Sequence, residues 1–169
     1  TTFREVNEIS ATWAKALAAD GIGKGDHVLI LQPISLELYL ALLAVFRLGA
    51  VAVFPDPQSL RATIEAACDR VHPRAMIGGW PAQLMRFVSR PLRGIPKTFT
   101  ASWPFWATNL PHRRNAPGPA ADVDPDHPAL ITFTSGSTGV PKVIARSHGF
   151  LAAQHAAINR AVAFEAGTA

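Results

Sequence analysis

A short segment between two apolar runs combines hydroxyl groups, glycines and a lysine. From residue 133 to residue 142 it reads FTSGSTGVPK, and it follows the apolar run 129–131. Backbone N–H groups and hydroxyls in such a loop can donate hydrogen bonds to one anion, and glycines let the backbone approach that anion closely. Lys142 adds a compact positive charge after Pro141, which stiffens the end of the loop. The segment therefore predicts a binding site for a polyphosphate.

Two other interpretations explain only part of this segment. A surface turn rich in Ser, Gly and Thr accounts for the hydroxyls and glycines, but not for a lysine three residues after the second glycine. A Walker A loop has the pattern Gly-x-x-x-x-Gly-Lys-Ser/Thr and opens a helix. Here Lys142 follows Pro141 and precedes the short apolar run 143–145, which favours a loop between two strands.

The segment resembles the phosphate-loop signature of the AMP-forming adenylating superfamily, which includes acyl- and aryl-CoA synthetases, luciferases and nonribosomal peptide adenylation domains. That signature is Thr/Ser-Ser-Gly-Ser/Thr-Thr-Gly-x-Pro-Lys, and it matches every position from Thr134 to Lys142. The upstream segments 2–6, 25–30 and 46–57 are similar to earlier motifs of the same superfamily, in the same order. The likeness thus covers nearly the whole chain.

The resemblance implies an activity and a set of binding residues. In full-length form the protein would use ATP and Mg²⁺ to convert a carboxylic acid into an acyl-adenylate, and would then pass the acyl group to a thiol such as CoA or that of a carrier protein. No residue of this chain is assigned a catalytic or metal-binding role. Lys142 would supply countercharge to the β- and γ-phosphates, which would be cradled by Thr134, Ser135, Gly136, Ser137, Thr138 and Gly139.

The identity of the acid stays open. Residues 77–84 loosely resemble a segment of fatty-acyl and olefin-pathway ligases, so we favour an aliphatic acid, with aryl and amino acids as alternatives. The superfamily's later motifs, which bear a magnesium-holding acid, a ribose-binding aspartate and a late lysine, are absent. We therefore expect residues 1–169 to be the N-terminal portion of an adenylating domain and to be inactive in adenylation alone. The rest of that domain and the small mobile domain are then its missing partners.

Two hypotheses of other classes remain. One is a non-catalytic remnant or interaction module with the same fold, and the other is an unrelated nucleotide-binding domain. The second would bind ATP measurably with this chain alone. A reading frame that continues into the later motifs would favour the ligase.

The bulk properties fit one cytoplasmic domain. The chain has 169 residues, of which 49% are hydrophobic, enough for a sizeable core. Its longest apolar run, 38–46, is well short of the ~20 residues that span a bilayer, and the polar N-terminus shows no secretory signal. Cys68 is the single cysteine, which excludes an internal disulfide, and its helical context predicts a core position.

Basic residues are concentrated between Asp69 and Asp122, where the chain has no acid. A basic surface can bind a membrane headgroup, a nucleic acid or a CoA phosphate. We favour instead a solvated surface whose acidic pairing residues lie in a part of the protein outside this chain. We expect no nucleic-acid partner. The nearby aromatic residues Trp103, Phe105 and Trp106 predict a packed loop. The basic residues of the stretch include Arg74, Arg86, Arg90, Arg93, Lys97, Arg113 and Arg114.

Helical and strand patterns alternate along the chain, which predicts an α/β fold with a largely parallel sheet flanked by helices. Residues 111–128 are rich in Pro, Asp, Ala and Gly and predict a loop that leads into the phosphate loop 133–142. Helices are expected at 3–19, 35–48, 59–68, 82–88 and 149–164. Strands are expected at 27–32, 50–54, 75–77, 98–100, 129–133 and 143–144.

Three weaker site candidates remain. The glycine-rich segment 21–26 precedes a strand, so it predicts a helix-to-strand turn and not a dinucleotide loop. His148 and His155 lie seven residues apart on one face of a helix, but without a third ligand we expect surface or capping roles. Arg146 and His148 follow the phosphate loop and could approach a phosphate or acyl group.

Overall fold

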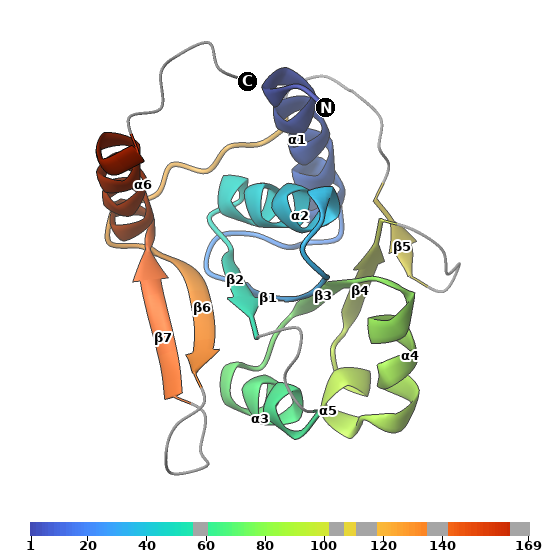
Figure 1. Ribbon diagram of the computed structural model, residues 1–169. Helices are drawn as coiled ribbons and strands as arrows, with labels where there is room; N and C mark the ends of the chain where they lie inside the picture. The colour runs from blue at the N-terminus through green and yellow to red at the C-terminus, as the bar shows by residue number, and fades with distance from the viewer. Residues whose placement is uncertain (56–60, 102–106, 111–117, 135–141, 163–169) are drawn as a thin grey trace.

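The chain folds around one mainly parallel sheet. The computed structural model describes residues 1–55, 61–101, 107–110, 118–134 and 142–162. Within them the sheet has seven strands in the order β5-β4-β3-β1-β2-β6-β7. All neighbouring strands are parallel except β6 and β7, so the predicted fold class is confirmed (Figure 1). The strands are β1 (His27–Leu31), β2 (Val51–Phe54), β3 (Ala75–Gly78), β4 (Lys97–Thr100), β5 (Thr108–Asn109), β6 (Pro128–Thr134) and β7 (Lys142–Ser147).

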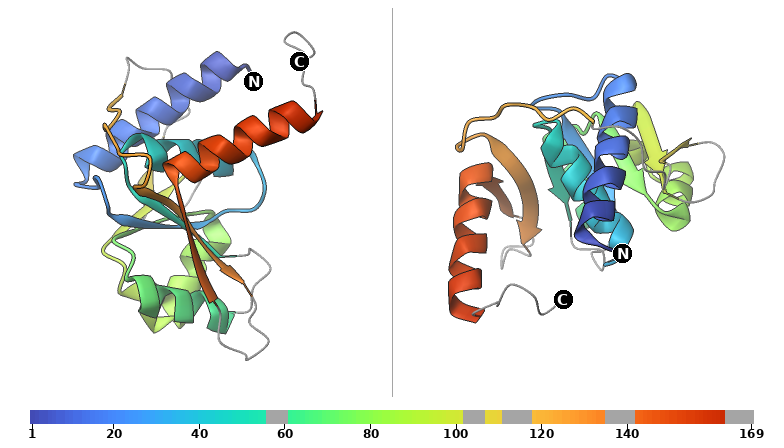
Figure 2. Two further views of the ribbon diagram at one scale, coloured as in Figure 1. Left: turned by 90° about the vertical axis from the view of Figure 1, so that its left-hand side faces the viewer. Right: turned by 90° about the horizontal axis from the view of Figure 1, so that it is seen from above.

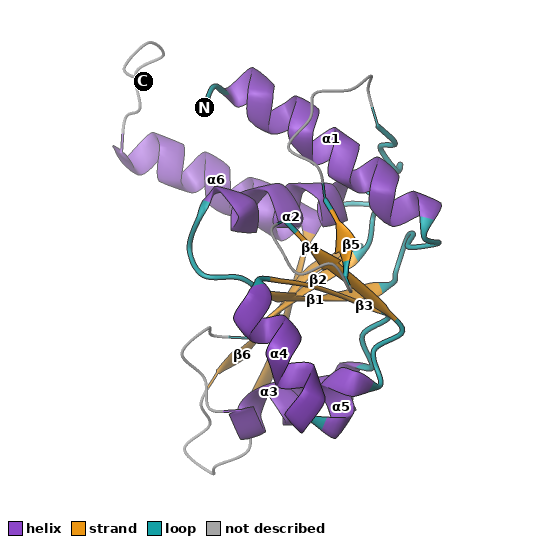
Figure 3. Ribbon diagram, turned by 90° about the vertical axis from the view of Figure 1, so that its right-hand side faces the viewer, coloured by secondary structure: helices purple, strands orange, loops and turns teal. Residues whose placement is uncertain are grey.

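Helices cover both faces of the sheet, because parallel neighbours need crossover connections. One face carries α1 (Phe3–Ala19) and α2 (Leu36–Arg47). The other carries α3 (Arg61–Val71), α4 (Trp80–Val88) and α5 (Arg90–Arg93), as Figure 3 shows from the side. The last helix, α6 (His148–Val162), follows β7 and lies on the α1 and α2 side, next to the β6–β7 hairpin (Figure 2).

Apolar spacing explains how α1 packs. Ile9, Trp13 and Leu17 recur every four residues and form its buried face, and Trp13 and Leu17 have no exposed area. The helix begins at a capping box, in which the Thr2 hydroxyl accepts from the Glu5 N–H and the Glu5 carboxylate accepts from the Thr2 N–H. Full burial of a large apolar side chain such as Leu17 stabilises the fold by roughly 1.5–3 kcal/mol.

Several local predictions are confirmed. Residues 21–26 form a turn between α1 and β1, in which Gly21 and Gly25 have φ of 84° and 82° and the Asp26 carboxylate accepts from the Gly23 N–H at 2.9 Å. Cys68 is buried in the core, and this burial raises the pKa of its thiol to about 12. It is therefore an apolar filler and not a nucleophile.

Other local predictions needed correction. The helix at 35–48 is apolar nearly all round, yet Tyr39 and Leu43 of α2 are exposed, and Leu43 lines a cavity together with Phe3 and Val6 of α1. The short elements α5 and β5 were not predicted. The helix at 80–88 begins two residues earlier than predicted, with Pro81 in its first turn.

None of the helices in the described part of the chain combines the length and apolar character needed to cross a bilayer.

Candidate functional site

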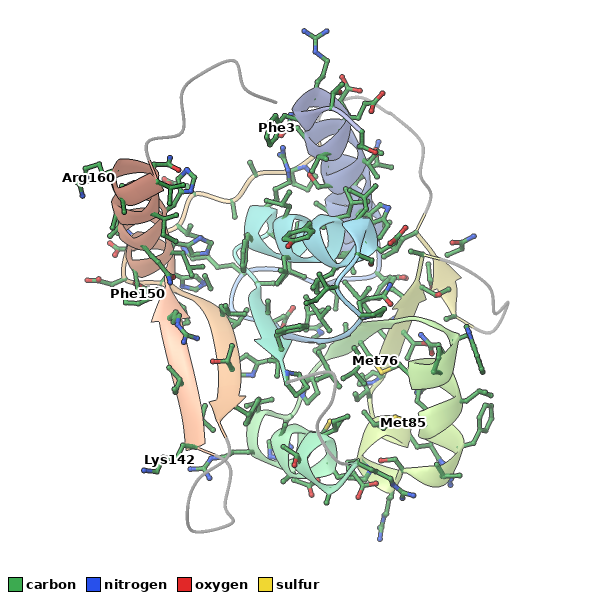
Figure 4. All side chains as sticks on the ribbon, in the orientation of Figure 1. Phe3, Met76, Met85, Lys142, Phe150 and Arg160 are labelled. Atoms are coloured by element: carbon green, nitrogen blue, oxygen red, sulfur yellow. The ribbon has the colours of Figure 1, made fainter. Side chains whose placement is uncertain are left out.

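The two ends of the predicted phosphate loop lie side by side in the sheet. Thr134 is the last residue of β6 and Lys142 the first of β7, and the two are register partners in an antiparallel hairpin. Lys142 is exposed, and Figure 4 shows it at the start of β7, at the end away from the arrowhead. The prediction of a loop between two strands is confirmed for its flanks. Ser135, Gly136, Ser137, Thr138 and Gly139 lie outside the described residues, so their roles stay predictions.

The hairpin delivers this loop to the carboxyl edge of the parallel strands. β6 runs parallel to β2 with Phe54 opposite Thr132, so Thr134 extends two positions past the end of β2. In open α/β sheets, ligands bind outside the carboxyl ends of the strands. A cavity of about 280 Å³ opens at the same edge, beyond β1 and β3, and is lined by residues such as Leu31, Gln32 and Gly79.

Arg146 lies on β7 and is tied to β6. Its guanidinium donates to the Thr132 hydroxyl across a distance of 2.7 Å. The contact therefore holds the Arg146 guanidinium beside Thr132, near the end of β6. Whether Arg146 reaches a phosphate or acyl group stays a prediction.

His148 lies at the junction of β7 and α6, where it packs instead of facing the loop. Its backbone N–H donates to the His127 carbonyl at 3.1 Å, and the two imidazole rings stack with centroids 6.1 Å apart. Its Nε2 is buried and has no hydrogen-bond partner among the described residues. Burial, followed by the proximity of His127, lowers the pKa of His148. A neutral imidazole with a packing role fits these contacts best.

No metal cluster forms from the described residues. His155 hydrogen-bonds Asn159 one turn along α6, at 3.0 Å from the amide nitrogen. A search of the described His, Cys, Asp and Glu residues finds no group of three or more that could hold a metal ion.

Much of the basic stretch has partners inside the chain. Arg74 pairs with Asp26 at 3.2 Å, and Lys97 approaches Asp20 at 4.0 Å. The expectation that the acidic complement lies outside the chain is therefore wrong for these two residues. Arg86 instead donates to the carbonyls of Leu92 and Ile95, and Arg93 to that of Phe87. Arg113, Arg114, Trp103, Phe105 and Trp106 lie outside the described residues.

Sequence reasoning did not single out Thr132 or His127. Thr132 had a usable signal, because it is a hydroxyl residue directly before the predicted phosphate loop 133–142. His127 had no such signal, since its Nε2 lies 2.8 Å from the carbonyl oxygen of Gly49, far away in the sequence.

Comparison with known proteins identifies the chain. The family model described as AMP-binding enzyme matches residues 1–168. The chain belongs to this family. The resemblance drawn from the phosphate-loop signature is thereby confirmed.

Similar members of the AMP-binding family carry different names. The chain is 33% identical over 171 residues to an olefin beta-lactone synthetase of Stenotrophomonas maltophilia, covering 98% of this chain and 31% of that protein. It is 32% identical over 169 residues to acetyl-coenzyme A synthetase 2 of Pseudomonas aeruginosa, covering 88% and 26%. The chain thus spans about a third of the length of the relatives it matches.

A solved structure agrees in fold. The long-chain-fatty-acid-CoA ligase FadD1 of Archaeoglobus fulgidus superposes with a TM-score of 0.81 over 98% of this chain and 33% of its own. At 21% identity this likeness supports the fold alone.

Proposed function

We propose that this chain is the nucleotide-phosphate-binding portion of an adenylate-forming ligase. The complete enzyme would activate a carboxylic acid with ATP as an acyl-adenylate and transfer the acyl group to a thiol such as CoA. The observation that carries the proposal is the hairpin, which pairs Thr134 with Lys142 and directs the loop between them past the carboxyl edge of the sheet. Family membership supports the reaction type.

In this proposal the loop binds the polyphosphate and does little covalent chemistry. Hydroxyls and backbone N–H groups between Thr134 and Gly139 would donate to the β- and γ-phosphates, while the Lys142 ammonium stabilises negative charge as pyrophosphate departs. Bound Mg²⁺ would neutralise further phosphate charge. Arg146, held by Thr132, would keep a second positively charged side chain beside the end of β6.

Phosphate binding can be tested with the chain itself. We expect pyrophosphate and ATP to bind and adenosine not to bind, because the proposed loop recognises the phosphates and not the nucleoside. Line broadening in ³¹P NMR measures weak binding of pyrophosphate and ATP, and line broadening of the adenine protons in ¹H NMR measures binding of adenosine and ATP. Loss of a charge-assisted contact in Lys142→Ala should weaken binding roughly tenfold or more.

A second lysine provides a matched control. Lys97 is also exposed and also begins a strand. It lies at the amino end of the parallel strands, because β4 is parallel to β3, whereas Lys142 lies at their carboxyl end, because β7 is antiparallel to β6. Lys97→Ala should leave binding unchanged. Equal affinity of the Lys142→Ala and Lys97→Ala variants would contradict the phosphate-loop proposal, and so would adenosine binding as tight as that of ATP.

We further propose that residues 1–169 form the N-terminal part of the adenylating domain and do not complete the reaction alone. Pyrophosphate release by the purified chain above the level of Lys142→Ala would refute this. The alternative of an interaction module is supported by the exposed apolar residues of α4 and α6. It predicts no difference in phosphate binding between the parent chain and Lys142→Ala.

A further inference from the structure

Helix α4 presents large apolar side chains to solvent. Trp80, Leu84, Phe87 and Val88 are 56%, 43%, 61% and 61% exposed. Their spacing of four, three and one places them along one face of the helix. The opposite side of α4 buries Ala82 and Gln83. We call the four exposed residues the α4 stripe.

Arginines surround one end of the α4 stripe. The guanidinium of Arg93 donates to the Phe87 carbonyl, and that of Arg61 donates to the Val88 carbonyl, so both are fixed at the C-terminal end of α4. Arg90, which opens α5 directly after this helix, is exposed. Positive charge is thus held beside the apolar side chains.

An acidic side chain offsets this charge only at Arg61, among the described residues. Between Arg70 and Ala121 the sequence contains no Asp or Glu. Glu65, on the neighbouring helix, is engaged by Arg61 at 2.7 Å, and this hydrogen bond lowers the pKa of its carboxyl group. The surface formed by α4 and α5 therefore carries net positive charge around an apolar centre.

We propose that the α4 stripe and its arginines bind the surface of an anionic phospholipid bilayer. Amphipathic helices that lie in the bilayer interface combine Trp, Phe and Leu on one face with basic residues at its border. Here the apolar residues would enter the interface and Arg90 and Arg93 would contact the headgroups. The chain would remain peripheral.

Other occupants fit this surface less well. A nucleic acid would use the arginines, but it would leave Leu84 and Val88 without a role. A second copy of the chain would bring an equally positive surface, so it would offer no complementary charge. An anionic phospholipid bilayer, by contrast, offers negative charge to the arginines and an apolar interior to the α4 stripe.

Vesicle co-sedimentation tests the proposal without nucleotide, so its outcome is independent of the ligase proposal. The protein should bind vesicles of phosphatidylcholine mixed with phosphatidylglycerol, should not bind phosphatidylcholine alone, and should dissociate as salt is added. Leu84→Ser should weaken binding roughly tenfold. Arg90→Glu should also weaken it, and because Arg90 is exposed this variant keeps the core intact.

Phe3 provides the matched control. It is 86% exposed, but it lies on α1 beside Glu5, so Phe3→Ser should bind as the parent protein does. Equal binding by the parent, Leu84→Ser and Arg90→Glu would overturn the proposal, as would equal binding to neutral vesicles. A concentration-dependent dimer that Leu84→Ser abolishes, with no vesicle binding, would assign the stripe to a second copy and also overturn it.

Discussion

The parallel strands and the β6–β7 hairpin belong to one sheet but are buried to very different extents. In β1 and β3 the residues Val28–Ile30 and Ala75–Ile77 have no exposed area. In β7, by contrast, residues are exposed or half-buried, and Lys142 and Ile144 are exposed. Helices cover both faces of the parallel strands, whereas α6 buries none of its own described residues. The candidate site thus lies at a hairpin that is less buried than the central parallel strands.

Because of this difference, we expect substitutions in the two regions to affect the stability of the fold and the binding of phosphate separately. A substitution in the parallel strands should unfold the molecule without touching the loop, and one in the hairpin should alter the loop at little cost in stability.

The largest contrast is expected between two apolar truncations. Leu29→Ala in β1 removes a fully buried side chain and should lower the free energy of unfolding by about 2–5 kcal/mol. Ile144→Ala in β7, where the side chain is 37% exposed, should cost less than about 1 kcal/mol. Urea unfolding followed by circular dichroism measures both. Similar costs would mean that the hairpin is packed as tightly as the centre.

Gly49 joins the two regions and should be next in effect. Its φ is +64°, and a Cβ added there would lie 2.7 Å from Val123 Cγ1 in the segment that leads to β6. Gly49→Ala should therefore cost about 1–2 kcal/mol from the backbone alone, with a further cost from the contact. Gly23→Ala, where an added Cβ meets nothing within 4 Å, is the control. If both variants unfold at the same urea concentration, the prediction that a side chain at residue 49 is strained and collides with Val123 is wrong.

A smaller effect is expected inside the hairpin. Thr132→Val keeps the shape of the side chain but removes the acceptor of the Arg146 guanidinium, and should destabilise by about 1 kcal/mol. The same change should increase hydrogen exchange in β7 and leave β1 to β3 unchanged. Faster exchange throughout the sheet would show that the hairpin and the parallel strands unfold together.

The smallest effect is a pH dependence at the start of α6. Because the pKa of His148 is lowered in the folded chain, the unfolded chain takes up the proton first as the pH falls. The stability that neutral His148 contributes is full above its unfolded pKa and is lost as the pH falls through its folded pKa. Unfolding measured from neutral to mildly acidic pH should show a steeper loss in the parent than in His148→Asn. Equal slopes would contradict the burial of this imidazole.

Local patterns predicted most of the fold, but not every contact. The apolar runs of β1 and β3 are bounded by Gly or Pro and were predicted nearly to the residue, and α1 was predicted with the bounds that it has. β5 was missed, because its two residues form a strand only through pairing with β4. The pairing of Arg74 with Asp26 joins residues 48 apart, so no local pattern signalled it.

The candidate site divides in the same way. By itself the sequence determined which chemical groups the loop contains, namely hydroxyls, glycines and a lysine, and predicted that they bind a phosphate. It also determined the strands of the sheet's centre, since burial on both faces requires continuous apolar runs. Only the tertiary structure decided that β6 extends past the carboxyl end of β2, that Thr132 holds Arg146, and that α4 turns an apolar face outward. These features depend on strand order, register and packing between distant segments, which residue spacing along one chain does not specify.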